Sequence, residues 1–198
     1  MLPRLLSRPR LNFPKLSTIN RSMTSPSSTA IHFGPYEVSN EVFYKTPLCY
    51  ALVNIKPILP GHVLVIPFRQ IQYLSELTPS EVTDVFLTVQ KVQKMLSLTY
   101  GTEDANVAIQ NGVESGQTVP HFHCHIIPRS KGNEEGDGFY LRLQGEEGNV
   151  GGKLWDDQRR PETKGKFPQL KDEDRHERSK EEMRKEAQWF SEQMKLVE

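Results

Sequence analysis

Three of the six histidines in this 198-residue chain stand at every second position: His121, His123 and His125. Alternate side chains of a β-strand point to the same face of a sheet. The spacing therefore predicts a strand with a row of imidazoles on one face and with Phe122, Cys124 and Ile126 toward the core. Because imidazole is the side chain that changes its charge near neutral pH, this row predicts a chemical site.

Three interpretations fit a row of imidazoles. Alternating histidines can give zinc two or three nitrogen ligands, with a water completing a hydrolytic site, and Glu103 or Glu114 could approach as a carboxylate ligand. Alternatively, one neutral imidazole attacks phosphorus while a neighbour moves protons. The third interpretation is an edge strand without chemistry, and three histidines beside a Gly-Gln-Thr loop argue against it.

A polar loop with glycines leads directly into the histidines. It comprises residues 111–118 and follows a short predicted strand at 105–110. By themselves such residues fit an ordinary connection between strands. Their place directly before the histidines favours a cradle in which backbone amides and a hydroxyl face an anion.

The other strands are predicted from β-rich runs that end at turn residues. Residues 42–45 and 49–54 read as a hairpin, and residues 62–67 read as a third strand that begins at His62. A histidine at the start of a strand is by itself more often a surface or capping residue. Only the three histidines elsewhere make His62 a candidate for the site.

Two helices complete an α+β pattern. Thr78-Pro79-Ser80-Glu81 forms a capping box, which predicts a helix that runs to about residue 100. The apolar stripe expected on this helix consists of Val82, Val85, Phe86, Val89, Val92 and Leu96. Ser179 begins the second helix, and its expected apolar face, next to Trp189, consists of Met183, Ala187, Phe190 and Met194.

Composition excludes several classes of partner. Lys plus Arg and Asp plus Glu number 25 each, so no net charge gathers nucleic acid or an anionic membrane. No apolar run approaches the roughly 20 residues of a membrane span. Cys49 and Cys124 lie in apolar runs, which argues against a disulfide and favours a reducing compartment.

One domain with additional segments is expected from the length. Residues 1–30 contain no acidic residue and fit equally a mitochondrial targeting segment and a disordered leader. Residues 31–130 carry the predicted strands and the first helix. Residues 131–178 are rich in Gly and Glu and are expected to form a flexible loop, and residues 179–198 form a helix that packs on the domain.

The run from His121 to Ile127 resembles the signature of the histidine triad (HIT) family, in which histidines alternate with apolar residues and two apolar residues follow. The chain is similar, more narrowly, to the fragile histidine triad (Fhit) branch. That similarity rests on Ala51-Leu52-Val53-Asn54, Lys56-Pro57, Pro60-Gly61-His62-Val63-Leu64-Val65, Gln110-Asn111-Gly112, Gly116-Gln117-Thr118-Val119 and Pro128-Arg129. It spans about residues 33–129 and resumes weakly at 181–187.

The resemblance implies hydrolysis of dinucleoside polyphosphates, typically of diadenosine triphosphate to AMP and ADP. His123 would attack and carry AMP as a phosphoramidate until water releases it, with no metal held by the histidines. The implied fold is α+β, with an antiparallel sheet of about five strands and two main helices, and the sheet continues across a homodimer. Magnesium or manganese would arrive on the phosphates of the substrate.

The resemblance also assigns the other site residues by their position in the motifs. The histidines expected in the pocket beside His123 are His125 and His121, with His62 packed behind them. The expected substrate-binding residues are Asn54 at the ribose, Gln110 in the phosphate region, Gly116, Gln117, Thr118 and Val119 at the phosphates, and again His125. The last group coincides with the cradle inferred from the loop itself.

Other functions stay open at this stage. A Hint-like phosphoramidase would release AMP from an amine, and a signalling module would act in its nucleotide-bound form with slow turnover. We expect a cytoplasmic location, with nuclear entry and a mitochondrial form as open alternatives. The physiological substrate and any signalling partner do not follow from the sequence.

Overall fold

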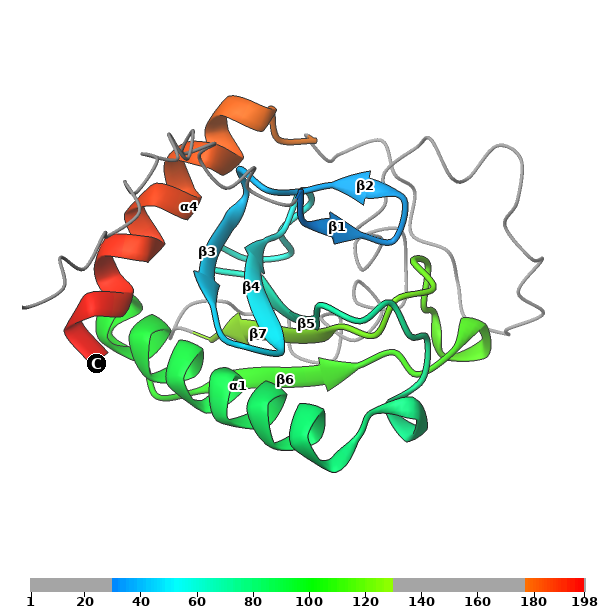
Figure 1. The fold of residues 1–198 in the computed structure, drawn as a ribbon. Coiled ribbons are helices and arrows are strands. Elements are labelled where there is room, and N and C mark those ends of the chain that lie inside the picture. Colours follow the sequence, from blue (N-terminus) through cyan, green and yellow to red (C-terminus); the bar gives the residue numbers. More distant parts are fainter. Residues whose placement is uncertain (1–29, 130–176, 198) are drawn as a thin grey trace, which may run out of the picture.

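The computed structural model describes residues 30–129 and 177–197, in which a five-stranded antiparallel sheet carries two long helices (Figure 1). The strands of this sheet are β3 (Val42–Lys45), β4 (Cys49–Val53), β5 (Val63–Pro67), β6 (Ala105–Ile109) and β7 (Cys124–Pro128). They lie in the order β3-β4-β5-β7-β6, and every neighbouring pair is antiparallel. The predicted α+β fold with five antiparallel strands and two main helices is confirmed.

The three central strands, β4, β5 and β7, are buried along their whole length. Both faces of the sheet are therefore covered at its centre, which explains the continuous apolar runs in these strands. Strand β5 begins at Val63, one residue later than predicted, so that His62 lies in the turn before it. The two cysteines on β4 and β7 are buried and free, in agreement with the prediction.

Helix α1 (Pro79–Tyr100) covers one face of the sheet and has the predicted capping box. The Glu81 N–H donates to Thr78 Oγ1 (3.3 Å), and the Thr78 N–H donates to Glu81 Oε2 (2.8 Å). The side chains that α1 buries in the main core are Val85, Val89, Val92, Met95 and Leu96. Each contributes roughly 1.5–3 kcal/mol by leaving water, so packing holds this helix.

The predicted apolar stripe on α1 is wrong at one position. Phe86 is 41% exposed, whereas Met95, which was not predicted, is buried. Successive residues of a helix are turned by about 100°, so Phe86 lies to the side of the line formed by Val85, Val89 and Val92. A window of apolar residues does not distinguish that flank from the buried stripe.

Helix α4 (Lys180–Met194) packs on the same core and is followed by the short 3-10 helix η5 (Lys195–Val197). The Ser179 side chain caps it, and all four predicted side chains are buried, as expected: Met183, Ala187, Phe190 and Met194. The ring centroid of Phe190 lies 5.3 Å from that of Phe43 on β3. The exposed Trp189 stacks on Phe190, with ring centroids 5.0 Å apart.

A small hairpin that was not predicted covers the opposite face of the sheet. It is formed by β1 (His32–Phe33) and β2 (Tyr36–Glu37), and the Tyr50 hydroxyl donates to the His32 carbonyl (2.9 Å). A second apolar cluster lies beneath it and consists of Ile31, Phe33, Tyr50, Leu52, Leu64, Ile66 and Val119. The hairpin therefore covers part of the sheet face opposite α1.

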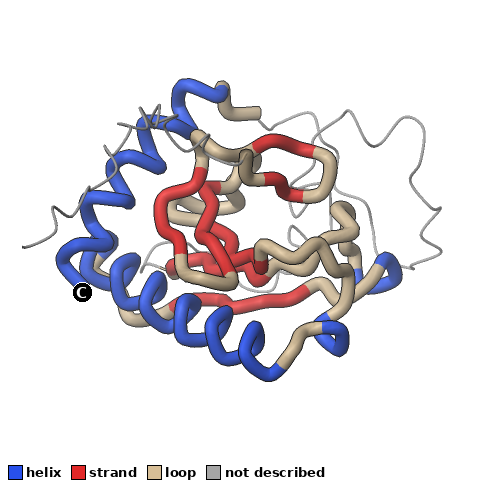
Figure 2. Tube along the Cα trace, in the orientation of Figure 1, coloured by secondary structure: helices blue, strands red, loops and turns tan. Residues whose placement is uncertain are grey.

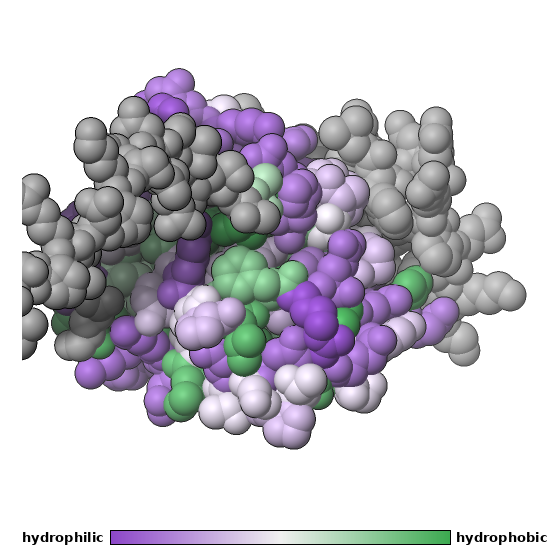
Figure 3. All heavy atoms as spheres, viewed as in Figure 1, coloured by the Kyte–Doolittle hydropathy of each residue, from purple (hydrophilic) through white to green (hydrophobic). Residues whose placement is uncertain are grey.

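Two short helical turns lie at the end of the sheet away from α4. They are η1 (Leu74–Glu76), just before α1, and η2 (Val113–Ser115), in the polar loop (Figure 2). The surface in this view is largely hydrophilic, with small hydrophobic patches rather than one broad one (Figure 3). Among residues 30–129 and 177–197, neither long helix has the length and apolar character needed to cross a membrane.

Candidate active site

Four histidines from two segments, residue 62 and residues 121–125, meet on the sheet face opposite α1. His125 lies on β7 and pairs with Leu64 of β5, while His123 directly precedes β7 and His62 directly precedes β5. The ring centroid of His125 is 5.0 Å from that of His123 and 5.1 Å from that of His62. All of these rings, and that of His121, are almost completely buried.

The predicted row of three histidines on one strand is only partly correct. Strand β7 begins at Cys124, so His121 and His123 lie in the segment before it. The alternation nevertheless extends to this segment, because Phe122, Cys124 and Ile126 all belong to the main core. Pro120 has no N–H and cannot donate to a sheet, which is consistent with the late start of the strand.

A chain of hydrogen bonds sets the proton positions on His62 and His125. The backbone N–H of Ile58 donates to His62 Nδ1 (3.1 Å), and His62 Nε2 lies 2.9 Å from His125 Nδ1. Neutral imidazole has one donor and one acceptor nitrogen. His62 therefore donates from Nε2 to His125 Nδ1, which leaves the proton of His125 on Nε2.

The same reasoning gives His123 the opposite arrangement. His123 Nδ1 lies 2.7 Å from the carbonyl oxygen of His121, which only accepts hydrogen bonds. Nδ1 of His123 therefore carries the proton, and Nε2 keeps a free lone pair. On His123, Nε2 thus offers a lone pair that can act as a nucleophile. On the neighbouring His125, Nε2 carries a proton and can donate a hydrogen bond.

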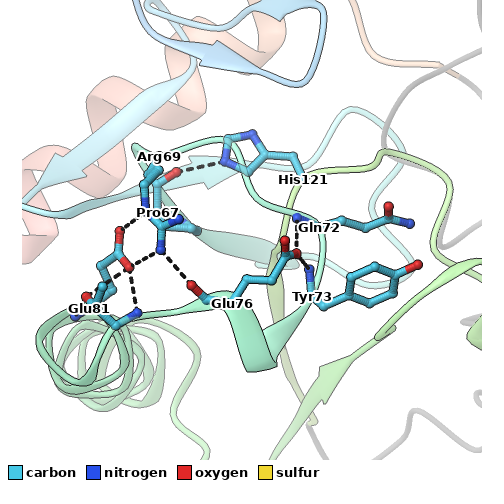
Figure 4. A network of polar contacts seen from close by, with 8 residues as sticks. Pro67, Arg69, Gln72, Tyr73, Glu76, Glu81 and His121 are labelled. Atoms are coloured by element: carbon cyan, nitrogen blue, oxygen red, sulfur yellow. Dashed lines mark hydrogen bonds and ion pairs between the residues drawn. The ribbon is translucent and has the colours of Figure 1, made fainter.

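His121 has both ring nitrogens bonded to the backbone. The N–H of Gly34 donates to Nδ1 (3.1 Å), and Nε2 donates to the carbonyl oxygen of Pro67 (2.8 Å; Figure 4). Its ring also lies beside that of Phe33, whose centroid is 5.6 Å away. In this structure His121 therefore ties the β1–β2 hairpin to the end of β5, and its carbonyl oxygen orients His123.

Burial keeps the four histidines neutral at physiological pH. It lowers the pKa of His123 to about 4 and, together with the nearby charge of Arg178, that of His62 to about 3. The pKa values of His125 and His121 are lowered by the same loss of hydration. Burial also raises the pKa of Cys124 to about 12, so its thiol stays protonated and faces the core.

Four buried side-chain atoms near these rings have no hydrogen-bond partner within the described part of the chain: Gln117 Oε1, Thr118 Oγ1, His123 Nε2 and His125 Nε2. More than nine in ten buried polar groups in proteins are bonded. Four exceptions within nine residues make this segment the candidate site for a polar ligand.

Gly116 and Val119, which were also predicted for the cradle, have different roles in the fold. Gly116 has a positive φ of 87°, which turns the loop back after η2. The Val119 side chain is buried in the second apolar cluster and lies close to Gly34, where an added Cβ would be 2.6 Å from Val119 Cγ1. This contact holds the loop against the β1–β2 hairpin.

The two predicted substrate-binding residues outside the loop also lie next to the histidines. Ile109 pairs with Cys124, so continuing the register by one residue places the buried Gln110 opposite His123. The Asn54 side chain is fully buried, and its Nδ2 lies beside the His62 ring, 3.3 Å from the acceptor Nδ1 and 3.2 Å from Nε2. Its Oδ1 accepts from the Lys56 N–H (3.0 Å).

No group of three or more His, Cys, Asp or Glu side chains within residues 30–129 and 177–197 is arranged to hold a metal ion. Two nitrogens of the histidine cluster, His62 Nε2 and His125 Nδ1, are already bonded to each other. A cation carried by the phosphates of a substrate would need no such set of protein ligands.

Comparison with known proteins agrees with these features. A family model described as the HIT domain matches residues 36–132. The bis(5'-nucleosyl)-tetraphosphatase (asymmetrical) of Schizosaccharomyces pombe is 47% identical over 167 residues, which cover 81% of this chain and 92% of that protein. The chain belongs to the HIT family.

Two further relatives extend the match beyond the HIT domain itself. The bifunctional bis(5'-adenosyl)-triphosphatase/adenylylsulfatase FHIT of Arabidopsis thaliana is 41% identical over 172 residues, covering 86% of this chain and 87% of that protein. The crystal structure of Plasmodium falciparum diadenosine triphosphate hydrolase, in complex with cyclomarin A, has a TM-score of 0.61 at 29% identity. That similarity covers 87% of this chain and 88% of the other.

Two contacts to the site of this HIT protein come from outside the matched range and were not predicted. The first is the Gly34 N–H on His121. The second is Arg178, whose guanidinium donates to the Asn54 carbonyl oxygen and pairs with Glu186 (2.6 Å). Glycine at position 34, a common turn residue, could have indicated the first contact. Nothing in the sequence indicated the second, because Arg178 lies at the end of the segment expected to be a flexible loop.

Proposed function

We propose that this HIT protein hydrolyses dinucleoside polyphosphates, and diadenosine triphosphate in particular, to AMP and ADP through a covalent intermediate on His123. The observation that carries the proposal is the pair of buried Nε2 atoms without partners on His123 and His125. One offers a lone pair to phosphorus and the other an N–H to a phosphoryl oxygen. The names of the relatives, a tetraphosphatase and a triphosphatase of dinucleotides, support the same class of substrate.

In the first step, His123 Nε2 forms a bond to the α-phosphorus. The bond from that phosphorus to the bridging oxygen breaks, and ADP leaves with the electron pair. The imidazole then carries positive charge, which the hydrogen bond from Nδ1 to the His121 carbonyl oxygen stabilises. The Nε2–H of His125 donates to the oxygen on which negative charge develops.

In the second step, water attacks the phosphorus of the His123–AMP intermediate. The P–N bond breaks, its electron pair returns to Nε2, and the proton of the water passes to solvent as AMP leaves. The low pKa of His123 favours this step, because the ring returns to its neutral form without retaining a proton. The ring is then ready to attack the next substrate molecule.

The remaining predicted residues bind the substrate in this proposal. Gly116, Gln117, Thr118 and Val119 surround the phosphates, with Gln117 Oε1 and Thr118 Oγ1 as the side-chain atoms that lack partners. An oxygen acceptor such as Gln117 Oε1 binds a phosphate through a water molecule or a cation rather than directly. Asn54 contacts the ribose of the AMP half, and Gln110 lies beside the attacked phosphorus.

The test is to incubate the purified protein with diadenosine triphosphate and to quantify the nucleotides. We expect AMP and ADP in equal amounts and, after a rapid acid-free quench, a protein whose mass has increased by one adenylyl group. His123→Asn should give neither. His32→Asn, which changes an exposed histidine outside the site, is the matched control.

Absence of AMP production, or full activity in His123→Asn, would refute the proposal. Rates on diadenosine tetraphosphate and on an AMP–amine, measured in the same assay, separate the three substrate classes. A larger kcat/KM on the amine would favour a phosphoramidase. Bound stoichiometric zinc would favour the metal mechanism.

We further propose that two copies of the chain pair through the outer edge of β6. Within the part of the chain that the structure describes, β6 is the end strand of the sheet and pairs as a strand with β7 alone, and Val107 at its centre is 44% exposed. An open antiparallel edge is a ready surface for a second copy related by a two-fold axis. Sedimentation analysis should give twice the chain mass, and Val107→Pro, which removes an edge N–H, should shift it toward the monomer.

A further inference from the structure

The segment from Gln72 to Leu74 is attached to both ends of the phosphate loop, which we define as residues 111–119. The Leu74 N–H donates to Asn111 Oδ1 (2.8 Å) at the start of the loop. Gln117 Nε2 donates to the Gln72 carbonyl oxygen (3.0 Å) near its end. The position of the segment is therefore coupled to that of the residues that surround the phosphates.

Glu76 holds this segment from the other side (Figure 4). Its Oε2 accepts from the N–H of Gln72 (3.1 Å) and from the N–H of Tyr73 (2.8 Å). The Glu76 carbonyl oxygen in turn accepts from Arg69 Nη2 (2.7 Å), and Arg69 pairs with Glu81 in the first turn of α1 (2.6 Å). The backbone at Tyr73 is thus fixed before any ligand binds.

The ring of Tyr73 lies with one edge against the phosphate loop. A Cβ added at Gly112 would be 3.1 Å from Tyr73 Cε1 and 3.8 Å from Cδ1, and Gly112 has a φ of 105° that favours glycine. The side chain is nevertheless 41% exposed, and its hydroxyl extends away from the polar network (Figure 4). With its edge on the loop, the ring presents a face to solvent.

We propose that this face of Tyr73 stacks on the base of the leaving nucleotide, the second nucleoside of a dinucleoside polyphosphate. The inference rests on the proposed function, because that base exists only in such a substrate. The leaving half carries phosphates and a ribose before its base, so the base lies beyond the phosphate loop. The buried Gln117 is bonded to Gln72, and the next residue, Tyr73, is exposed. These contacts therefore run from the phosphate loop outward to the surface, where the second base would lie.

The chemistry of the contact suits a base of any identity. Every base has a π-face, so stacking on an aromatic ring adds affinity without hydrogen-bond readout. Because the backbone of Tyr73 is already fixed by Glu76 and Asn111 through its neighbours, little conformational freedom is lost on binding. Tyr73 therefore selects for a leaving group that ends in a nucleoside over one that ends in phosphate.

The experiment compares two substrates that differ only in the leaving nucleoside. They are diadenosine triphosphate and the γ-methyl ester of ATP, which has the same phosphate chain but no second base. Tyr73→Ala should raise KM for the first about five- to a hundredfold and leave kcat for it, and both constants for the second, within twofold of wild type. Tyr73→Phe should behave as wild type, because stacking needs the ring and not the hydroxyl.

Phe86→Ala is the matched control, since Phe86 is an equally exposed aromatic side chain on α1. Equal losses on both substrates in Tyr73→Ala would overturn the inference and show that the ring only supports the loop. Unchanged KM for diadenosine triphosphate would overturn it as well. If wild-type protein hydrolyses neither compound, the proposed function is refuted instead. The role of Tyr73 is then decided by the dissociation constants of the two compounds, measured in His123→Asn with and without Tyr73→Ala.

Discussion

Two polar clusters in this protein, one partly buried and one fully buried, lie at the ends of strands, and they differ in whether their hydrogen bonds are complete. The first cluster joins the β3–β4 turn to α1 and consists of Thr46, Cys49, Asp84 and Thr88. Thr46 Oγ1 donates to Asp84 Oδ2, Cys49 Sγ donates to Thr88 Oγ1 (3.3 Å), and the Leu48 N–H donates to Asp84 Oδ2 (3.1 Å). Each of the four side chains has a partner.

The second cluster is the candidate site, where Gln117, Thr118, His123 and His125 each bury a polar atom that has no partner among the described residues. Desolvation of an unbonded polar group costs about 1–3 kcal/mol, so the folded chain retains this cluster at a cost in stability. The difference teaches that a cluster whose hydrogen bonds are all made within the protein stabilises the fold. A cluster that leaves polar atoms without partners is instead suited to bind a ligand. Variants of the two clusters should therefore separate stability from turnover.

The largest expected effect is on turnover in His123→Asn. Loss of the attacking imidazole should lower kcat by about 10³-fold or more. Within the described residues His123 Nε2 has no partner to lose, and the amide of Asn can replace Nδ1 as donor to the His121 carbonyl oxygen. The free energy of unfolding should therefore change by less than about 1 kcal/mol. Steady-state kinetics and urea denaturation on the same preparation check both statements, and a parallel loss of stability would contradict the comparison.

Changes at His62 should act on turnover through the proton of His125. His62→Leu leaves His125 Nδ1 without its donor at 2.9 Å, so the proton is no longer confined to Nε2. We expect kcat to fall by about 10²-fold. His62→Gln keeps an N–H donor and should recover part of the rate, which a purely steric role of His62 would not explain.

The complete cluster should show the opposite result. Asp84→Ala removes the acceptor of two hydrogen bonds, from Thr46 and Leu48, and should lower the free energy of unfolding by about 1–3 kcal/mol. Asp84→Asn keeps an oxygen acceptor and should lose less. In both variants kcat/KM should stay within twofold of wild type, and a larger change would mean that this cluster also positions the site.

The smallest effect is a slope in the dependence of stability on pH. Unfolded histidine has a pKa near 6.5, whereas folded His123 has a pKa of about 4. Between these values the unfolded chain binds a proton that the folded chain excludes. The free energy of unfolding therefore falls as the pH falls below about 6.5, by up to about 1.4 kcal/mol per pH unit for this histidine.

Urea denaturation of wild type and of His123→Asn from pH 8.5 to pH 4.5 measures this contribution. Above pH 7 the two proteins should show no difference in slope. Below about pH 6 the wild-type slope should be steeper by about 1.4 kcal/mol per pH unit. Identical slopes would mean that His123 exchanges protons as freely when folded as when unfolded.

Most of the fold followed from local patterns, because those patterns act within one element. The capping residues Thr78 and Ser179 and the turn prolines fix where helices and strands begin, and they do so without distant contacts. His121, His123 and His125 followed from their spacing, whereas His62 became a candidate only because of those three. The proposed roles of His123 and His125 depend on proton positions that His121 and, through His62, Ile58 determine, and no spacing reveals these hydrogen bonds.

The parts that could not be predicted depend on contacts between distant residues. Gly34 and His121 are 87 residues apart, and Arg178 and Asn54 are 124 residues apart. The β1–β2 hairpin has strands of only two residues, too short for a periodic signal. The exposure of Phe86 was missed for a similar reason, since only packing against the sheet decides which flank of α1 is covered.

The backbone N–H of Ile58 determines more than the shape of its turn. It stands between Pro57 and Pro60 in a segment where proline is otherwise accepted, yet its donation to His62 Nδ1 is what leaves the proton of His125 on Nε2. Proline at position 58 would remove that N–H, allow His62 to carry its proton on Nδ1, and turn His125 from a donor into an acceptor. The choice of which nitrogen of His125 carries the proton thus depends on a main-chain N–H, and substitution by alanine would not remove that group.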